Sequence, residues 1–191
     1  GTPETVNSIT KDMMIDYMTD QYRPNNVVLV VAGQIEHAEV EDLLSKSSLD
    51  LRNVGNREMI PSKETKLDNP IVVENRSTEQ AHICLSFPGV GVMDSDRYSL
   101  DLLNTVLGEG MASRLFLSLR EDKGIVYEVG SSVAKLTDTG SMTIYAGTDP
   151  KNANDAIQGI MEELDRAVEY IDQLELDRAR ELIKGRLFLG L

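Results

Sequence analysis

The hydrophobic pattern of the first fifty residues predicts two helices separated by a strand. After Thr10, a favourable N-cap, apolar residues recur every three to four positions, which predicts an amphipathic helix that ends before Pro24. Residues 26–33 are β-branched and almost continuously apolar up to a closing glycine, which is typical of a strand covered on both faces. Residues 35–48 place apolar positions among acidic ones and predict a second helix. These three elements cannot close a core by themselves, because the strand needs sheet neighbours.

Residues 51–69 separate this first part from the rest of the chain. They are mostly polar, show no hydrophobic period and contain Gly55 and Pro61, which is typical of a linker. We therefore predict a domain boundary here, with residues 1–50 on one side and residues 70–191 on the other.

The second part alternates pairs of strands with pairs of helices. Strand patterns cover residues 70–76, 80–87, 125–136 and 140–147, and helical patterns cover residues 94–107 and 112–123, a stretch after Pro150 and a stretch that begins near Asp172. This order predicts an α+β fold, with antiparallel strands and helices packed on one face of the sheet, and argues against a doubly wound parallel sheet. Because apolar residues close the chain with nothing after them to cover them, we expect both ends to be cut from a longer protein.

Charge and cysteine content exclude several classes of partner. With 19 basic and 32 acidic residues among 191, the formal net charge is −13, which repels a phosphate backbone or an anionic membrane surface. The longest apolar run, residues 27–32, is far shorter than the roughly 20 residues that span a bilayer. We expect neither nucleic acid nor a membrane as a partner. The single cysteine, Cys84, excludes an internal disulfide framework and fits a reducing compartment.

Few residues suit metal or nucleophilic chemistry. The two histidines, His37 and His82, lie in different predicted domains, and neither has a second histidine at helical spacing, so we expect no zinc site within this chain. His82 and Cys84 alternate on the polar side of one predicted strand, but no orienting carboxylate accompanies them, and we interpret the pair as strand surface. Gly108 and Gly110 are interpreted as a helix end and a tight turn, because the other residues of a phosphate-binding loop are missing.

Arg120 and Tyr127 are the candidate substrate-binding residues. They stand at the end of one predicted helix and the start of the next predicted strand, with Gly124 at the turn between them. A guanidinium and a phenol offer several hydrogen-bond donors to a carbonyl oxygen, as peptide hydrolysis requires. The pattern by itself favours a structural role, in which Arg120, one turn after Phe116, lays its apolar stem along the surface with its charged end in water, and Tyr127 fills a half-buried strand position.

Three ordered stretches carry a resemblance to a known family. The first contains GTPE, YRPNN and VAG within residues 1–33, the second is LGEGMASRLF at residues 107–116, and the third is LREDKGIVY at residues 119–127. Together they resemble the insulinase/pitrilysin-type zinc metallopeptidases, the family that includes mitochondrial processing peptidase and the core proteins of the respiratory cytochrome complex. The first stretch is similar to the end of the family's catalytic N-terminal domain, and the other two are similar to the middle of the next domain. The ordered set is more specific than any one stretch.

The resemblance implies a clam-shell of related α+β domains that closes around an unfolded peptide. Arg120 and Tyr127 match the family's arginine and tyrosine, which position the substrate backbone and stabilise the tetrahedral oxyanion. The resemblance also implies Zn²⁺ as the cofactor of the parent enzyme. The family's zinc motif, His-x-x-Glu-His, belongs before Gly1 and has no match in this sequence. We therefore expect no zinc to be bound by residues of this chain and no peptide hydrolysis by the chain alone.

The resemblance assigns a place to each predicted domain. Residues 1–50 correspond to the C-terminal tail of the zinc-bearing N-terminal domain, residues 51–69 to a linker that we hypothesise to be a hinge, and residues 70–191 to a substrate-binding domain truncated at its C-terminus. The parent is expected to be a zinc endopeptidase that cleaves unfolded peptides or presequences. Its expected partners are an extended peptide and the rest of the clam-shell, in the same polypeptide or in a second subunit, with a homodimer as a further arrangement. The bacterial cytoplasm is favoured as the compartment over the mitochondrial matrix.

Two alternative functions stay open. A non-catalytic homologue of the same family would serve as a scaffold or partner subunit, and the Arg120 and Tyr127 pair argues against it, because a subunit that never binds a scissile peptide needs neither group. Without the resemblance, the chain is interpreted as a generic acidic α+β interaction domain.

Overall fold

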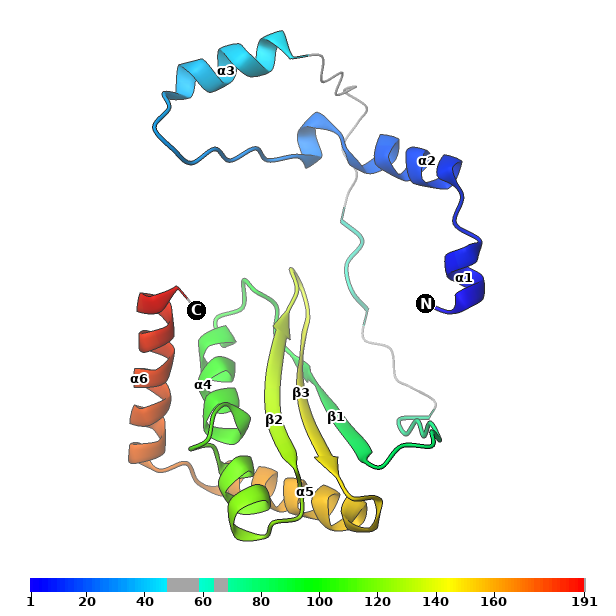
Figure 1. Cartoon of the computed structure of the whole chain (residues 1–191). Coiled ribbons are helices and arrows are strands. Elements are labelled where there is room, and N and C mark those ends of the chain that lie inside the picture. The colour runs from blue at the N-terminus through cyan, green and yellow to red at the C-terminus, as the bar shows by residue number, and fades with distance from the viewer. Residues whose placement is uncertain (48–58, 64–68, 191) are drawn as a thin grey trace. The chain divides into compact units, whose positions relative to one another are not determined.

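The computed structural model describes residues 1–47, 59–63 and 69–190, and the chain divides into two compact units, Gly1–Ile60 and Pro61–Leu191 (Figure 1). We call them unit 1 and unit 2. Most of the predicted linker, residues 51–69, lies outside the described residues. The assignment of the two sides of this linker to parts of a clam-shell enzyme therefore stays a prediction.

Unit 1 is built from helices. Its elements are α1 (Pro3–Asn7), α2 (Lys11–Gln21), the short 3-10 helix η1 (Pro24–Asn26) and α3 (His37–Lys46). The helix predicted after Thr10 is confirmed as α2, and the Thr10 side chain accepts a hydrogen bond of 3.2 Å from the Met13 N–H. The helix predicted within residues 35–48 is confirmed as α3. None of the unit 1 residues whose burial the structure describes is buried.

The strand predicted over residues 26–33 is wrong. After η1 the chain has no regular structure up to residue 32, and the side chains of Val28 and Val30 are 88% and 81% exposed. A strand forms only where a neighbouring strand supplies the other half of its hydrogen bonds. The described part of unit 1 contains no strand, so these β-branched residues have no edge with which to pair.

Unit 2 contains a three-stranded antiparallel sheet. Its strands are β1 (Ala81–Gly89), β2 (Glu128–Lys135) and β3 (Gly140–Thr148), in the order β1-β3-β2 (Figure 1). In the central strand, Ala146 lies opposite Ile83 of β1 and Val129 of β2. The predicted hairpin between β2 and β3 is confirmed, and its turn includes a 2.8 Å hydrogen bond from the Leu136 N–H to the Thr139 carbonyl.

The strand predicted over residues 70–76 is wrong. The segment has no regular structure, and the side chain of Val72 is 88% exposed. A 3.0 Å hydrogen bond from the Thr78 N–H to the Arg76 carbonyl marks a bend before β1. Among the described residues β1 pairs with β3 alone. The β-branched side chains favour an extended backbone, but this preference is too weak to form a strand without pairing.

The helices of unit 2 cover one face of the sheet (Figure 1). They are α4 (Arg97–Gly108), the π-helix η2 (Phe116–Asp122), the 3-10 helix η3 (Pro150–Asn152), α5 (Ala153–Glu169) and α6 (Gln173–Leu189). Helix α4 packs against β2, α5 packs against β1 and β3, and α6 packs against α4. Along β1, Ile83 and Leu85 pack toward the core, whereas His82 and Cys84 are exposed. The predicted α+β fold, with helices on one face of an antiparallel sheet, is confirmed.

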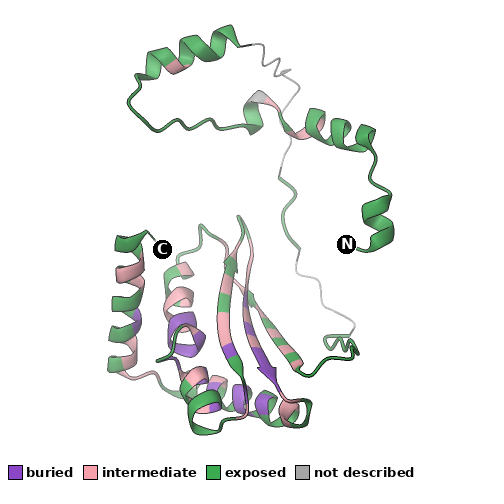
Figure 2. Cartoon of the chain, viewed as in Figure 1, coloured by how far each residue is buried: buried purple, intermediate pink, exposed green. Residues whose placement is uncertain are grey.

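The hydrophobic core lies between the sheet, α5 and the helix that contains η2. The side chains of Leu115, Leu119, Ile144 and Ile160 are fully buried, and Figure 2 shows buried residues on β3, α4 and α5. Burial of one such side chain contributes about 1.5–3 kcal/mol. Both leucines belong to the helix that contains η2, so burial of their side chains holds this helix against the sheet.

Candidate functional site

A left-handed glycine ends η2 and reverses the chain toward β2. The helix predicted before Gly124 is confirmed, but its hydrogen bonds span five residues, as from the Lys123 N–H to the Ser118 carbonyl at 3.0 Å. Gly124 has a φ of +61°, which a residue without a Cβ adopts at little cost. The Ile125 N–H then reaches back to the Leu119 carbonyl at 3.0 Å. Backbone hydrogen bonds therefore fix both sides of the turn.

Arg120 projects from the last part of η2 into solvent. Its neighbour Leu119 is fully buried, so the backbone that carries Arg120 is held by the core. The Arg120 guanidinium carbon lies 5.0 Å from the centroid of the Phe116 ring, within the range of a cation–π interaction. Among the residues that the structure describes, no carboxylate forms an ion pair with Arg120. The guanidinium donors are thus available to a ligand.

Tyr127 stands on the other side of the same turn, just before β2. It follows the buried Val126, and its N–H donates a hydrogen bond of 2.8 Å to the Gly147 carbonyl of β3. The side chain is 55% exposed. Within the described chain its hydroxyl makes no hydrogen bond, and none joins it to Arg120. The structure therefore places the two predicted residues on either side of one turn, each with a free donor.

Lys151 is a basic neighbour of Tyr127 that the sequence pattern did not reveal. Its ammonium group pairs with Asp149 at 2.9 Å, and this hydrogen bond raises the pKa of Lys151, with a smaller contribution from the nearby Tyr127. The same interaction lowers the pKa of Asp149. The proximity arises because β2 begins beside the end of β3, and no short motif links residues so far apart along the chain.

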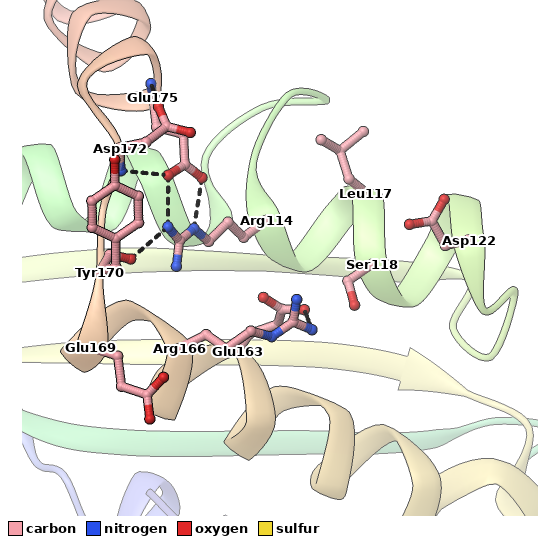
Figure 3. A pocket seen from close by; sticks show the side chains of 10 residues that line it. All are labelled: Arg114, Leu117, Ser118, Asp122, Glu163, Arg166, Glu169, Tyr170, Asp172 and Glu175. Atoms are coloured by element: carbon pink, nitrogen blue, oxygen red, sulfur yellow. Dashed lines mark hydrogen bonds and ion pairs between the residues drawn. The ribbon is translucent and has the colours of Figure 1, made fainter.

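An open cavity of about 430 Å³ lies beside η2, but the candidate residues do not line it (Figure 3). The Arg114 guanidinium donates two hydrogen bonds of 2.6 Å to the Glu175 carboxylate and one of 2.8 Å to the Tyr170 carbonyl. The bond between the two side chains is the main cause of the lowered pKa of Glu175 and of the raised pKa of Arg114. This ion pair connects the start of the helix that contains η2 to α6, and we interpret its role as structural.

The other polar candidates form no metal site. The His82 Nδ1 lies 2.8 Å from the Tyr145 hydroxyl on the open face of the sheet, and Cys84 is an exposed free thiol on the same face. His37 lies in unit 1, 3.4 Å from Glu41. Across residues 1–47, 59–63 and 69–190, no group of three or more His, Cys, Asp or Glu side chains is placed to hold a metal ion. The described residues do not fit a zinc ion.

No helix in the described part of the chain is long and apolar enough to span a membrane.

Comparison with known proteins identifies the family. Residues 8–183 match the family described as "Peptidase M16 inactive domain". The chain belongs to the M16 peptidase family. This M16 chain is 37% identical over 199 residues to an uncharacterised zinc protease of Bacillus subtilis, covering 100% of the chain and 46% of the relative. It is 32% identical to a similar protein of Streptomyces coelicolor, covering 100% of the chain and 43% of the relative. The resemblance to zinc metallopeptidases is confirmed, and the chain spans about half the length of these relatives.

Solved structures confirm the fold of the M16 chain. A protease from Helicobacter pylori superposes with a TM-score of 0.77 at 23% identity, over 98% of this chain and 47% of that one. A chain of complex III2 from Candida albicans superposes with a TM-score of 0.83 at 20% identity, over 98% of this chain and 46% of that one. At these identities the likeness concerns the fold alone, and one fold is shared by proteins with different tasks.

Proposed function

We propose that this M16 domain is the substrate-positioning half of a zinc endopeptidase that cleaves unfolded peptides or presequences. The observation that carries the proposal is the pair of unengaged donors, Arg120 and Tyr127, on the two sides of one hydrogen-bonded turn. Each follows a buried residue, Leu119 or Val126, so the backbone beneath both donors is anchored while their polar ends stay exposed. Groups that bind a reacting atom need such anchored supports.

The chemistry of the two side chains suits a peptide carbonyl. A guanidinium offers five N–H donors and carries a permanent charge, and a phenol offers one O–H donor. Directed at a scissile carbonyl, they orient the substrate and stabilise the negative oxygen of the tetrahedral intermediate. Neither donor has to leave a partner within the described chain before it binds the substrate.

Zinc belongs to the part of the enzyme outside this chain. The relatives are named zinc proteases, and zinc in such an enzyme polarises the carbonyl and activates water. The role that we assign to this chain is to bind and orient the peptide, and its described residues hold no group of three or more potential metal ligands. By itself it should not hydrolyse peptides. Its partner is the zinc-bearing half, in the same polypeptide or in a second subunit, and a homodimer and a bacterial cytoplasmic location are parts of the same proposal.

The surroundings of the site favour a basic, extended substrate. Glu121, Asp122 and Glu128 are exposed and stand next to Arg120 or Tyr127 along the chain. The basic neighbours Lys123 and Lys151 are each paired with a carboxylate, of Glu162 and Asp149. The charges of the three acidic residues therefore attract basic side chains that flank the scissile bond, within about 10 Å at ordinary salt concentrations. A presequence is one such basic substrate.

Replacement of the two donors in the complete enzyme tests the proposal. Arg120→Ala and Tyr127→Phe should each lower kcat on an internally quenched, unstructured peptide by about 10²–10³-fold, the usual loss for one oxyanion donor. Zinc content, measured by mass spectrometry, should stay unchanged. Arg178→Ala and Tyr170→Phe serve as matched controls, because both side chains are exposed and lie on or near α6, and they should retain activity.

The scaffold alternative makes the opposite prediction. A complete protein without bound zinc, or one whose activity is unaffected by Arg120→Ala and Tyr127→Phe, would contradict the proposed role and favour a non-catalytic partner subunit. A fluorescent unstructured peptide provides a second measurement, since loss of either donor should also weaken its binding in an anisotropy titration.

A further inference from the structure

Phe116 lies outside the core cluster of unit 2. It is half-buried, next to the fully buried Leu115, yet it is not among the side chains that pack against the core cluster. Its ring instead lies under the Arg120 guanidinium, with the central carbon 5.0 Å from the ring centroid. The ring therefore has a contact with Arg120 and little share in the described core.

The contact restricts an otherwise mobile side chain. An exposed arginine has many rotamers, and confining it at the moment of substrate binding costs conformational entropy. The electron-rich face of an aromatic ring attracts a guanidinium without occupying its N–H donors. A phenylalanine four residues before an arginine on a helix can thus hold the guanidinium in place and leave its donors directed outward.

We propose that Phe116 is a positioning residue for Arg120, which orients the guanidinium toward the peptide before the peptide arrives. This inference rests on the proposed function of Arg120 and goes beyond it, because Phe116 is assigned a role through the arginine and not through the substrate. Arg114 has a different role in the same helix, because its guanidinium is hydrogen-bonded to Glu175 and supports the backbone.

A double-mutant cycle in the complete, zinc-loaded enzyme tests the inference. Phe116→Leu keeps an apolar side chain but removes the aromatic face, and Phe116→Tyr keeps that face. In the natural background, Phe116→Leu should lower kcat/KM on the quenched peptide about two- to fivefold, and Phe116→Tyr should retain the natural value. In the Arg120→Ala background, Phe116→Leu should cause no further loss. Because the contact exists in the folded enzyme without substrate, the loss of thermal stability caused by Phe116→Leu should be larger in the natural background than in the Arg120→Ala background.

Each outcome of the cycle decides between the two roles. Equal losses of kcat/KM in both backgrounds, or no loss in the natural background, would overturn the positioning role and leave Phe116 as a packing residue. If Arg120→Ala itself leaves turnover unchanged, the proposed function fails together with this inference. If Arg120→Ala lowers turnover and Phe116→Leu does not, only this inference fails. Anisotropy titration of the labelled peptide gives an independent measure of the same coupling.

Discussion

Units 1 and 2 contain similar sequence signals for helices but differ in the contacts that stabilise their folded structure. In unit 1, side chains cap the N-termini of α1 and α2, as Thr10 does for α2. None of the unit 1 residues whose burial the structure describes is buried. Unit 2 has a sheet whose Ile144 and Ala146 are fully covered by helices. The comparison shows that local signals suffice to form a helix, whereas a strand and a core require residues that are distant along the chain.

The length of the relatives offers an explanation for the exposed apolar residues of unit 1. The side chains of Val28 and Val30 are largely exposed, and the chain covers 46% of the Bacillus subtilis protein. The proposal that residues 1–50 belong to the zinc-bearing domain predicts that the rest of that domain pairs with and covers this segment. Unit 2 needs no such partner to bury Ile144.

The largest contrast between the two units should appear on truncation of one apolar side chain in each. Ile144→Ala should lower the free energy of unfolding of this 191-residue chain by about 2–5 kcal/mol, because it leaves a cavity in a fully packed core. Val30→Ala should change it by less than about 0.5 kcal/mol, because that side chain already contacts water. Chemical denaturation followed by circular dichroism measures both. Equal effects would show that the units do not differ in packing.

Two glycines of unit 2 test how closely its backbone is packed. A Cβ on Gly108 would lie 2.5 Å from the backbone nitrogen of Ser131, so Gly108→Ala should destabilise the chain by about 1–3 kcal/mol. Gly185 lies within α6 with no atom in the way, and Gly185→Ala should stabilise it by about 0.5–1 kcal/mol. Melting temperatures of the two variants should therefore move in opposite directions. A shift in the same direction would contradict the close approach of α4 to β2.

The smallest contrast concerns ion pairs at acid pH. The bond from Arg114 depresses the pKa of Glu175 below its usual value near 4.5, so its stabilisation is complete above that pH and is lost as pH falls through the folded-state pKa. Glu175→Gln should lower stability by about 1–2 kcal/mol at neutral pH and flatten its decline below pH 4.5. Asp42→Asn breaks an exposed pair with Lys46 in unit 1 and should change little. Denaturation curves from pH 7 to pH 3 measure both, and parallel declines for Glu175→Gln and the natural chain would exclude a depressed pKa.

Much of unit 2 could be predicted from the sequence because its signals are local and mutually consistent. The hairpin turn before Gly140, the Asp172 cap of α6 and the alternation along β1 all lead to the observed elements. The π-helical winding of η2 could not be predicted, because the pattern of residues 112–123 indicates a helix but not the span of its hydrogen bonds.

The candidate site was predicted in part. The sequence identified Arg120 and Tyr127 through a family resemblance, since the pattern by itself favoured a structural role. Their exposure and the hydrogen bonds of the turn became known only from the structure. The position of Lys151 beside Tyr127 follows from strand pairing between β2 and β3, which brings together residues that no motif joins.

The sequence by itself determined the helices, the α+β order of unit 2 and the family, because each depends on neighbouring residues or on short ordered motifs. Only the tertiary structure decided which apolar runs become strands. Residues 26–33 and 80–87 were both predicted to be strands, yet among the described residues only the second pairs with another strand, β3. The physical reason is that half of the hydrogen bonds of a strand and most of its buried area come from another part of the polypeptide.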